Sequence, residues 1–512
     1  MNLKQYFFTG LLCCGIAAAL ASCASCSSDD DNKQDSNPLI DNPQEQPTTP
    51  DGGTTGRNEQ YRPQIHFTPA KNWMNDPNGM VYADGIYHLF YQYNPQGNDW
   101  GNMSWGHATS PDMLHWTEQP VALTRDELGD IFSGSAVIDK QNTAGFGANA
   151  MVAIYTSATE KQQQSIAYST DGGQTFTRYN ANPVIKNDDD NLRDPKVFWH
   201  EESSQWIMCL AKGWKMGIEI YGSKDLKSWQ HLSTFVTDLK GRPSLQWECP
   251  DLIKMGNKWV LLVSVNPGGP ILGSGTMYLV GQFDGKEFKA ESLDYPIWLD
   301  YGMDNYAGVT WSNTGDRRIL LGWMNNWEYA GSVPCSPWRS AMTLPRELKL
   351  SEYDGKPLLC CPVVSEIEKI AGEWKKVDAT ELPLASKKDA YQLRLTIGLD
   401  KNSTITLSND KDEKYVLDIN ASARTLTAHR TAQTGRADFS GKFSVPSMNA
   451  PLNVVGNEVT FDLYIDQSSV ETLTKDGTMS MTNLVFPQSI YDRLTVTGAN
   501  YEAQVRVLNS VW

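Results

Sequence analysis

Residues 80–91 read Met80-Val81-Tyr82-Ala83-Asp84-Gly85-Ile86-Tyr87-His88-Leu89-Phe90-Tyr91, and this stretch decides the fold class. Two short runs rich in aromatic and branched residues flank Asp84-Gly85, a dipeptide that favours the tight turn of a β-hairpin. Similar short runs, separated by turn residues, continue from about residue 61 to about residue 350, without a long amphipathic helical pattern. The sequence therefore predicts a large all-β domain over residues 61–350, built from antiparallel hairpins.

A loose internal repeat within this segment indicates how the hairpins are grouped. Ser-x-Asp followed by an aromatic residue recurs roughly every 55 residues, a period expected for propeller blades of four strands. Dividing the segment by this period predicts a five-bladed β-propeller. Because Ser-x-Asp is also a common turn sequence, the interpretation depends on the shared aromatic position. The three copies are Ser110-Asp112-Trp116, Ser169-Asp171-Phe176 and Ser223-Asp225-Trp229.

The C-terminal segment, residues 365–512, has a different pattern. Its strand-like runs alternate strictly between apolar and polar residues, which indicates sheets with one buried face. We expect a C-terminal β-sandwich that supports the first domain. The clearest runs are Tyr391–Ile397, Thr404–Leu407, Val459–Ile465 and Gln504–Val507.

The N-terminal residues predict export and a lipid anchor. The apolar run from Tyr6 to Ala21 is too short for a stable membrane span and is typical of a secretory signal. Leu20-Ala21-Ser22-Cys23 resembles a bacterial lipobox, which implies a lipoprotein signal peptide over residues 1–22 and acylation of Cys23, with Cys26 as the alternative. Residues 23–60 are expected to form the anchor and a disordered linker, since they contain almost no apolar side chains. The expected product is an exported bacterial lipoprotein on the outer membrane, at the cell surface or the periplasmic face.

Composition narrows the class of ligand. The 512 residues include 44 basic and 60 acidic side chains, a net charge of −16 that repels nucleic acid. The 17 Trp and 21 Tyr suit the stacking of neutral sugar rings, although large β-proteins are often rich in aromatic residues. Neither the nine cysteines nor the seven histidines have metal-site spacing, so buried free thiols and no metal or cofactor are expected.

Three carboxylate motifs are candidates for glycosidic bond cleavage, which requires one acid and one further carboxylate. In Trp73-Met74-Asn75-Asp76-Pro77-Asn78-Gly79, the Pro and Gly predict a tight turn that fixes Asp76 at a strand end. In Asn191-Leu192-Arg193-Asp194-Pro195, the adjacent guanidinium is expected to keep Asp194 ionised. In Gln246-Trp247-Glu248-Cys249-Pro250-Asp251, the indole and thiol are expected to raise the pKa of Glu248 and keep its proton available. Taken singly, each motif also fits a structural carboxylate in a turn or at a sheet edge.

Together the motifs resemble glycoside hydrolase family 32, the invertases, inulinases and levanases. The three runs occur in the family's order, and Phe132-Ser133-Gly134-Ser135 matches a fourth family motif. The resemblance covers about residues 61–512, including Asp466-Gln467-Ser468-Ser469-Val470-Glu471 of the C-terminal segment. It implies a five-bladed propeller followed by a sandwich, and a retaining double displacement on β-linked fructofuranosides.

The resemblance also implies roles for individual residues. Asp76 would be the nucleophile, Glu248 the acid/base and Asp194 the transition-state stabiliser. The residues expected to line the fructosyl pocket are Asn75, Gln92, Trp100, Phe132, Ser133, Arg193 and Trp327, with Trp323 as the alternative to Trp327.

Within the family, Asn266–Pro270 followed by Gly273–Thr276 is more similar to exo-acting inulinases and levanases than to plant invertases. This favours release of terminal fructose from inulin, levan and sucrose-type sugars. Three alternatives remain at this stage: an endo-acting levanase or inulinase, a surface fructan-binding protein without turnover, and a propeller hydrolase of another sugar such as arabinan.

Overall fold

The computed structural model describes residues 57–187, 191–236, 246–271, 273–291 and 297–512. The predicted signal peptide, Cys23 and nearly all of the predicted linker lie outside these ranges. Within them, no helix has the length and apolar character needed to cross a bilayer. The helices of the described ranges are three short 3₁₀ turns, η1 (Gly213–Lys215), η2 (Ala330–Ser332) and η3 (Ser365–Lys369).

The N-terminal part of the described chain forms five antiparallel sheets in sequence order. The first contains β1 (Asn72–Ala83), β2 (Ile86–Tyr93), β3 (Ser104–Ser110) and β4 (Thr117–Leu123), and the second contains β5 (Asp130–Asp139), β6 (Ala150–Ala158), β7 (Gln162–Ser169) and β8 (Thr177–Arg178). The third contains β9 (Leu192–His200), β10 (Gln205–Lys212), β11 (Gly217–Ser223) and β12 (Gln230–Val236). The fourth contains β13 (Trp247–Met255), β14 (Lys258–Val265), β15 (Gly275–Phe283), β16 (Phe288–Ala290) and β17 (Ile297–Trp298), and the fifth contains β18 (Tyr306–Thr310), β19 (Ile319–Met324), β21 (Ala341–Met342) and β22 (Arg346–Glu347).

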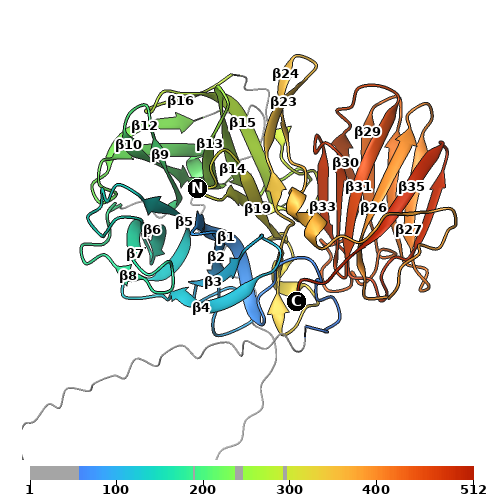
Figure 1. The fold of residues 1–512 in the computed structure, drawn as a ribbon, viewed down its shortest axis with the longest axis horizontal. Coiled ribbons are helices and arrows are strands. Elements are labelled where there is room, and N and C mark those ends of the chain that lie inside the picture. Colours follow the sequence, from blue (N-terminus) through green and yellow to red (C-terminus); the bar gives the residue numbers. More distant parts are fainter. Residues whose placement is uncertain (1–56, 188–190, 237–245, 272, 292–296) are drawn as a thin grey trace, which may run out of the picture. The chain divides into compact units, whose positions relative to one another are not determined.

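The first strand of each sheet faces the centre of a ring. Strands β1, β5, β9, β13 and β18 contact one another in cyclic order, and β18 returns to β1 (Figure 1). The late strand β20 (Trp338–Arg339) pairs in parallel with β1 and so ties the end of this segment to its beginning. This arrangement confirms the predicted five-bladed β-propeller.

The Ser-x-Asp repeat marks the same turn in three successive blades. Ser110, Ser169 and Ser223 are the last residues of β3, β7 and β11, the third strand of each sheet. In each turn the Ser hydroxyl donates a hydrogen bond to the Asp two residues later, over distances of 3.2, 2.7 and 3.1 Å respectively. The repeat is therefore structural.

The hairpin prediction is also confirmed, since Asp84 and Gly85 link β1 to β2 with φ of 50° and 84°.

The C-terminal residues form two facing sheets, shown in orange and red in Figure 1, which confirms the predicted sandwich. Side chains from both sheets, including Leu393, Ile405, Leu417 and Leu463, share one buried core. One sheet contains β25 (Lys375–Lys376), β35 (Tyr501–Leu508), β26 (Ala390–Gly398), β31 (Glu458–Asp466), β32 (Ser469–Thr474) and β33 (Ser480–Leu484). The other contains β30 (Val445–Pro451), β29 (Thr425–Arg430), β28 (Lys414–Asn420), β27 (Ser403–Ser408) and β34 (Arg493–Thr497), and a hairpin of β23 (Lys349–Tyr353) and β24 (Lys356–Cys360) precedes both sheets.

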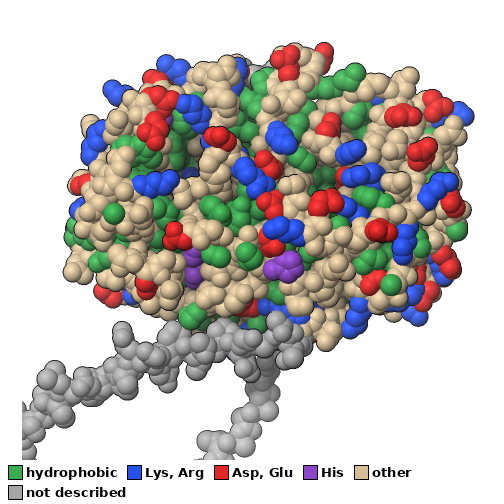
Figure 2. Space-filling view, viewed as in Figure 1, with side chains coloured by type: hydrophobic (Ala, Val, Ile, Leu, Met, Phe, Trp, Pro, Cys, Tyr) green, Lys and Arg blue, Asp and Glu red, His purple; other side chains and the backbone are tan. Residues whose placement is uncertain are grey.

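Charged side chains of both signs are interspersed on the face shown in Figure 2, where Lys and Arg do not gather into one extended basic patch.

A buried ionic network joins the sandwich to the propeller. Glu471 of β32 accepts hydrogen bonds from His66 Nε2 at 2.7 Å, from the Leu344 backbone N at 2.9 Å and from Arg346 of β22. The other ring nitrogen of His66 lies 2.8 Å from Asp466. Burial alone would lower the pKa of His66, but Asp466 and Glu471 outweigh it and raise this pKa to about 9. The family motif at residues 466–471 thus positions the two domains.

We predict that Glu471→Ala lowers the free energy of unfolding by about 3–5 kcal/mol, because buried Arg346 loses its nearest carboxylate and keeps only Asp300 at 3.5 Å, and buried His66 keeps only Asp466. Urea unfolding at neutral pH measures this loss. Glu381→Ala is the matched control, because the Glu381 side chain is 81% exposed in its ion pair with Arg493 in the same domain. That variant is expected to change stability by less than about 1 kcal/mol. Equal effects of the two substitutions would contradict the proposed importance of the network.

Candidate active site

All five central strands carry a β-bulge near one end of the ring. At this end of the ring, each strand has one extra residue relative to its hydrogen-bonded neighbour, which bends the strand and redirects its side chains. The extra residues fall between Met74 and Pro77, Ile131 and Gly134, Arg193 and Lys196, Glu248 and Asp251, and Tyr306 and Val309. Three bulges contain a non-glycine residue with positive φ, namely Asp194 (63°), Cys249 (46°) and Ala307 (51°).

The bulges explain how the carboxylate motifs are positioned, and they correct one prediction. Asp76 was expected in a tight turn at a strand end, but it lies inside the continuous strand β1. Pro77 and Gly79 accompany two register shifts in this strand instead of ending it. A bulge fixes the direction of a side chain as firmly as a turn does, and it keeps the strand in the ring.

Asp76 is held by polar contacts at both carboxylate oxygens. Ser133 of β5 donates its hydroxyl to Oδ2 at 2.6 Å, and Asn75 donates its side-chain amide to Oδ1 at 3.0 Å. The Cys249 thiol lies 3.5 Å from Oδ2. Burial raises the pKa of Asp76, the Ser133 hydrogen bond opposes this shift, and the charge of Glu248 reinforces it. The carboxylate is thus rigidly oriented in a site that disfavours its charge.

Asp194 is buried beside the same thiol. Its Oδ2 accepts a hydrogen bond from the Cys249 backbone N at 2.9 Å and lies 3.6 Å from Cys249 Sγ. The pKa of Asp194 is raised to about 7, chiefly by burial; Arg193 opposes this shift, and the charges of Glu248 and Asp76 reinforce it. Arg193 therefore does not keep the pKa of Asp194 near its ordinary value, because the effect of burial exceeds that of the neighbouring guanidinium.

Arg193 reaches Glu248 instead. Its Nη2 lies 2.5 Å from Glu248 Oε1, whereas its Nε is 3.8 Å from Asp194 Oδ2. The Gln246 side-chain amide donates to the same Glu248 oxygen at 2.9 Å, and the Tyr306 hydroxyl donates to the other. The predicted low-polarity environment of Glu248 was also wrong: Trp247 packs into a core cluster, and the Cys249 thiol faces the two aspartates.

The three carboxylates therefore converge from strands that are far apart in sequence. Asp76 (β1), Asp194 (β9) and Glu248 (β13) lie close together, since the charge of Glu248 raises the pKa of both aspartates and the charge of Asp76 raises that of Asp194. The Cys249 thiol lies near both aspartates, Ser133 donates to Asp76, and Arg193 and Tyr306 bind the glutamate.

Six of the seven predicted pocket residues fall into three groups. Asn75, Ser133 and Arg193 contact the carboxylates directly. Trp100, whose surface is 50% exposed, packs edge-on against Phe132 at 6.1 Å between ring centroids. Gln92 is buried, and its amide donates to the Ile131 carbonyl at 2.9 Å, so that it braces the start of β5.

The choice between Trp327 and Trp323 is decided by exposure. Trp323 is 0% exposed, and its indole N–H donates to the Met74 carbonyl at 3.1 Å. Trp327 is only partly buried and stacks on Trp73 at 5.8 Å, with 28° between the ring planes. Trp327 is therefore the tryptophan whose surface is available to a ligand.

Four residues around the carboxylates were not predicted as site residues. Cys249 and Gln246 belong to a motif that had been identified, but the sequence did not indicate their contacts. Tyr306 lies at the bulge of β18, and Gln162 bonds Arg193 Nη1 at 3.2 Å. Neither of these two belongs to a recognisable motif, so only the structure reveals them.

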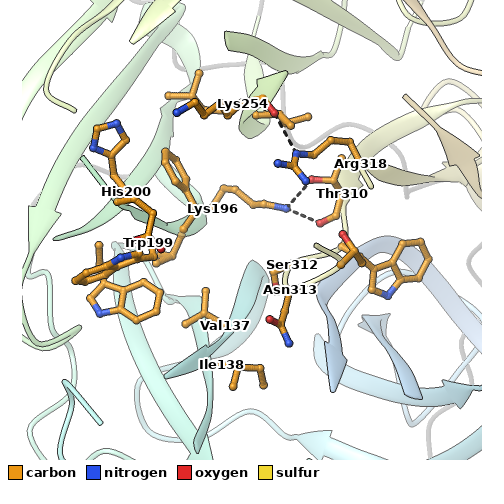
Figure 3. A pocket seen from close by; sticks show the side chains of 18 of the residues that line it. Val137, Ile138, Lys196, Trp199, His200, Lys254, Thr310, Ser312, Asn313 and Arg318 are labelled. Atoms are coloured by element: carbon orange, nitrogen blue, oxygen red, sulfur yellow. Dashed lines mark hydrogen bonds between the residues drawn. The ribbon is translucent and has the colours of Figure 1, made fainter. Parts of the chain in front are cut away.

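A cavity of about 580 Å³ lies at the other end of the central strands (Figure 3). Lys196 points into it and pairs with Asp251 at 3.0 Å. The three carboxylates do not line this cavity.

In the part of the chain that the structure describes, no group of three His, Cys, Asp or Glu residues could hold a metal ion. The five cysteines of this part, Cys209, Cys249, Cys335, Cys360 and Cys361, are buried free thiols, as predicted.

Comparison with known proteins agrees with this geometry. The sequence profile of the glycosyl hydrolases family 32 N-terminal domain matches residues 66–362, and that of the family's C-terminal domain matches residues 366–511. The chain belongs to glycosyl hydrolase family 32. The resemblance drawn from the four motifs is thereby confirmed.

Individual relatives cover most of the chain. A levanase of Bacillus subtilis is 44% identical over 478 residues, which are 88% of this chain and 70% of the levanase. An extracellular exo-inulinase of Aspergillus niger is 36% identical over 529 residues, covering 89% of this chain and 96% of the inulinase. The crystal structure of the exo-inulinase from Aspergillus awamori superposes with a TM-score of 0.82 at 34% identity, covering 89% of this chain and all of that chain.

The environment of Asp194 predicts a pH-dependent cost to stability in this family 32 protein. The pKa of Asp194 is about 7 in the folded protein, against an ordinary value of 3.8. This difference adds to the free energy of unfolding below pH 3.8, and the contribution is lost as the pH rises to about 7. Asp194→Asn should therefore raise the melting temperature at pH 8 more than at pH 4.

Thermal melts of both proteins at the two pH values measure this difference. Asp171→Asn is the opposite-sign control, because hydrogen bonds from Ser169 and Thr175 outweigh burial and lower the pKa of Asp171 to about 2. That variant should melt at a lower temperature than the wild type at pH 8. A shift for Asp194→Asn that is the same at pH 4 and pH 8 would contradict the assignment.

Proposed function

We propose that this protein is a retaining β-fructosidase that removes terminal fructose from fructans such as inulin and levan, and from sucrose-type sugars. The observation that carries the proposal is the convergence of Asp76, Asp194 and Glu248 within one ring of bulged strands. The similarity to a levanase and to exo-inulinases supports fructan as the substrate class.

The proposed reaction proceeds in two steps. Asp76 attacks the anomeric carbon of a β-fructofuranoside while Glu248 donates a proton to the glycosidic oxygen, which leaves with the bonding electron pair. The result is a fructosyl ester on Asp76. Glu248, now ionised, then accepts a proton from water as that water attacks the same carbon and releases fructose with retained configuration. Both groups finish in their starting protonation states.

The contacts around each carboxylate suit these roles. Ser133 and Asn75 orient the Asp76 oxygens for attack. Arg193, Gln246 and Tyr306 hold Glu248, and Arg193 stabilises the anion that remains after the proton is donated. We propose that Asp194 binds sugar hydroxyls and supports the oxocarbenium-like transition state.

The same proposal assigns the fructosyl pocket to residues around this centre. Partly exposed aromatic faces would pack on the furanose ring, and amide and hydroxyl groups would bind its hydroxyls. The proposed lining is Asn75, Gln92, Trp100, Phe132, Ser133, Arg193 and Trp327.

We predict that Asp76→Asn lowers turnover on inulin, levan and sucrose by a factor on the order of 10⁴ or more, because no nucleophile remains. Glu248→Gln should lower it by about 10²–10⁴-fold through loss of proton transfer. Reducing-sugar assays measure both losses. Asp171→Asn, in an exposed turn of the second blade, should retain full activity. Wild-type protein that binds fructan without releasing sugar would instead indicate a binding protein.

The same digests distinguish exo from endo attack. Exo action yields fructose alone from the first time point, whereas endo action yields a ladder of oligosaccharides. Fructose without a ladder is the expected result, and a ladder from either polymer would contradict exo action.

We also propose that the protein is exported and anchored to the outer membrane through acylated Cys23. The apolar run of residues 6–21 and the Leu20–Cys23 sequence support this proposal. A single acyl chain binds a bilayer only marginally, so stable anchoring requires more than one chain on the modified cysteine.

Cys23→Ser should move the protein from the membrane fraction to the soluble exported fraction when it is expressed in a bacterium that processes lipoproteins. Cys26→Ser is the matched control and should remain in the membrane fraction. If the Cys26→Ser variant appears in the soluble fraction and the Cys23→Ser variant stays in the membrane fraction, the acylated residue is Cys26.

A further inference from the structure

Two tryptophans of the described residues are highly exposed, and one of them has no role in the proposed fructosyl pocket. Trp100 is 50% exposed and Trp214 is 49% exposed. Trp214 is the middle residue of η1 (Gly213–Lys215), the 3₁₀ turn that connects β10 to β11 in the third blade. An exposed indole offers a flat apolar face on which a sugar ring can stack.

The turn lies at the same end of the ring as the carboxylates. Lys212, which precedes it, pairs with Leu192, the residue before Arg193. The turn also contacts β13, the strand that carries Glu248. Trp214 therefore lies beside the strands that supply Arg193 and Glu248, one strand outward from the centre.

The turn is rigidly built. The Gly213 backbone N donates to the Asn191 carbonyl at 3.2 Å, and the Trp214 backbone N donates to the Asn191 side-chain oxygen at 3.0 Å. A Cβ at Gly213 would come within 1.8 Å of that oxygen, so a larger residue would displace the Asn191 side chain that holds the turn. Met216 closes the turn in the left-handed conformation, with φ of 47°. These contacts fix the backbone of the turn that carries Trp214.

We propose that Trp214 is the stacking platform for the leaving-group sugar. This inference rests on the proposed function, in which Glu248 protonates the glycosidic oxygen. The sugar attached to that oxygen must lie on the Glu248 side of the site, away from the fructosyl ring bound at Asp76. An exposed aromatic side chain on a turn next to the Glu248 strand is placed to pack on this sugar, and binding energy from the remote sugar accelerates cleavage of the bond.

The test compares two substrates that share the fructosyl group and differ in the leaving group. With nystose, an inulin-type tetrasaccharide, the leaving group is a sugar chain. With β-fructofuranosyl fluoride, the leaving group is fluoride, which has no ring that could stack on Trp214. Trp214→Ala should lower kcat/KM for nystose about tenfold, a loss typical of one aromatic contact. Its kcat/KM for the fluoride should stay within about twofold of the wild type. Trp214→Phe should recover most of the loss on nystose.

Tyr501→Ala provides the matched control. Tyr501 is an exposed aromatic residue, 42% exposed, at the start of β35 in the sandwich, and its loss should change neither substrate's kinetics. Equal losses of Trp214→Ala on nystose and on the fluoride, or a lowered melting temperature, would show that Trp214 is structural. Unchanged activity of Trp214→Ala on nystose would also contradict the proposal that Trp214 stacks on the leaving-group sugar. Failure of the wild type to release fructose from either substrate would instead overturn the proposed function itself.

Discussion

One extra residue in each central strand is the constraint on which the site depends. A regular strand alternates its side chains between two faces of the sheet, so neighbouring residues cannot point to the same side. The bulges break this alternation at the same level in all five strands. As a result, Asn75 and Asp76 in β1 both take part in the site, and the Cys249 backbone N reaches Asp194. The geometry of the carboxylates is thus a property of the backbone.

The same backbone forces acidic groups into a space that opposes their charge. Burial raises the pKa of both Asp76 and Asp194, and each is affected by another carboxylate of the cluster. Donors from the adjacent strands offset part of this cost, namely the Ser133 hydroxyl, the Cys249 N–H and the Arg193 guanidinium. Such a site is unstable in isolation, and it requires a scaffold that cannot relax around it.

The sequence predicted the scaffold better than the details of the site. Turn dipeptides such as Asp84-Gly85 and the Ser-x-Asp repeat act locally, so hairpins and blades could be inferred without knowing tertiary contacts. The partner of Arg193 could not, because adjacency in sequence favoured Asp194, whereas the bulge in β9 brings the guanidinium to Glu248 from another blade. Tyr306 was missed for the same reason. Its contact with Glu248 depends on the ring bringing β18 next to β13.

Buried ion pairs connect the sandwich to the fifth blade of the propeller. The fifth sheet is the least regular, since its outer positions are occupied by the two-residue strands β21 and β22. Arg346 of β22 is fully buried against Glu471, and Asp304, just before β18, is fully buried against Arg430 of β29. Pairs of this kind contribute little net energy compared with apolar packing, but each is costly to break, so they specify one arrangement of the two domains. Because Tyr306 follows Asp304 by two residues, the same ion pair also limits the movement of the hydroxyl that holds Glu248. The C-terminal domain therefore acts on the site through β18, although none of its side chains contacts the three carboxylates among the described hydrogen bonds.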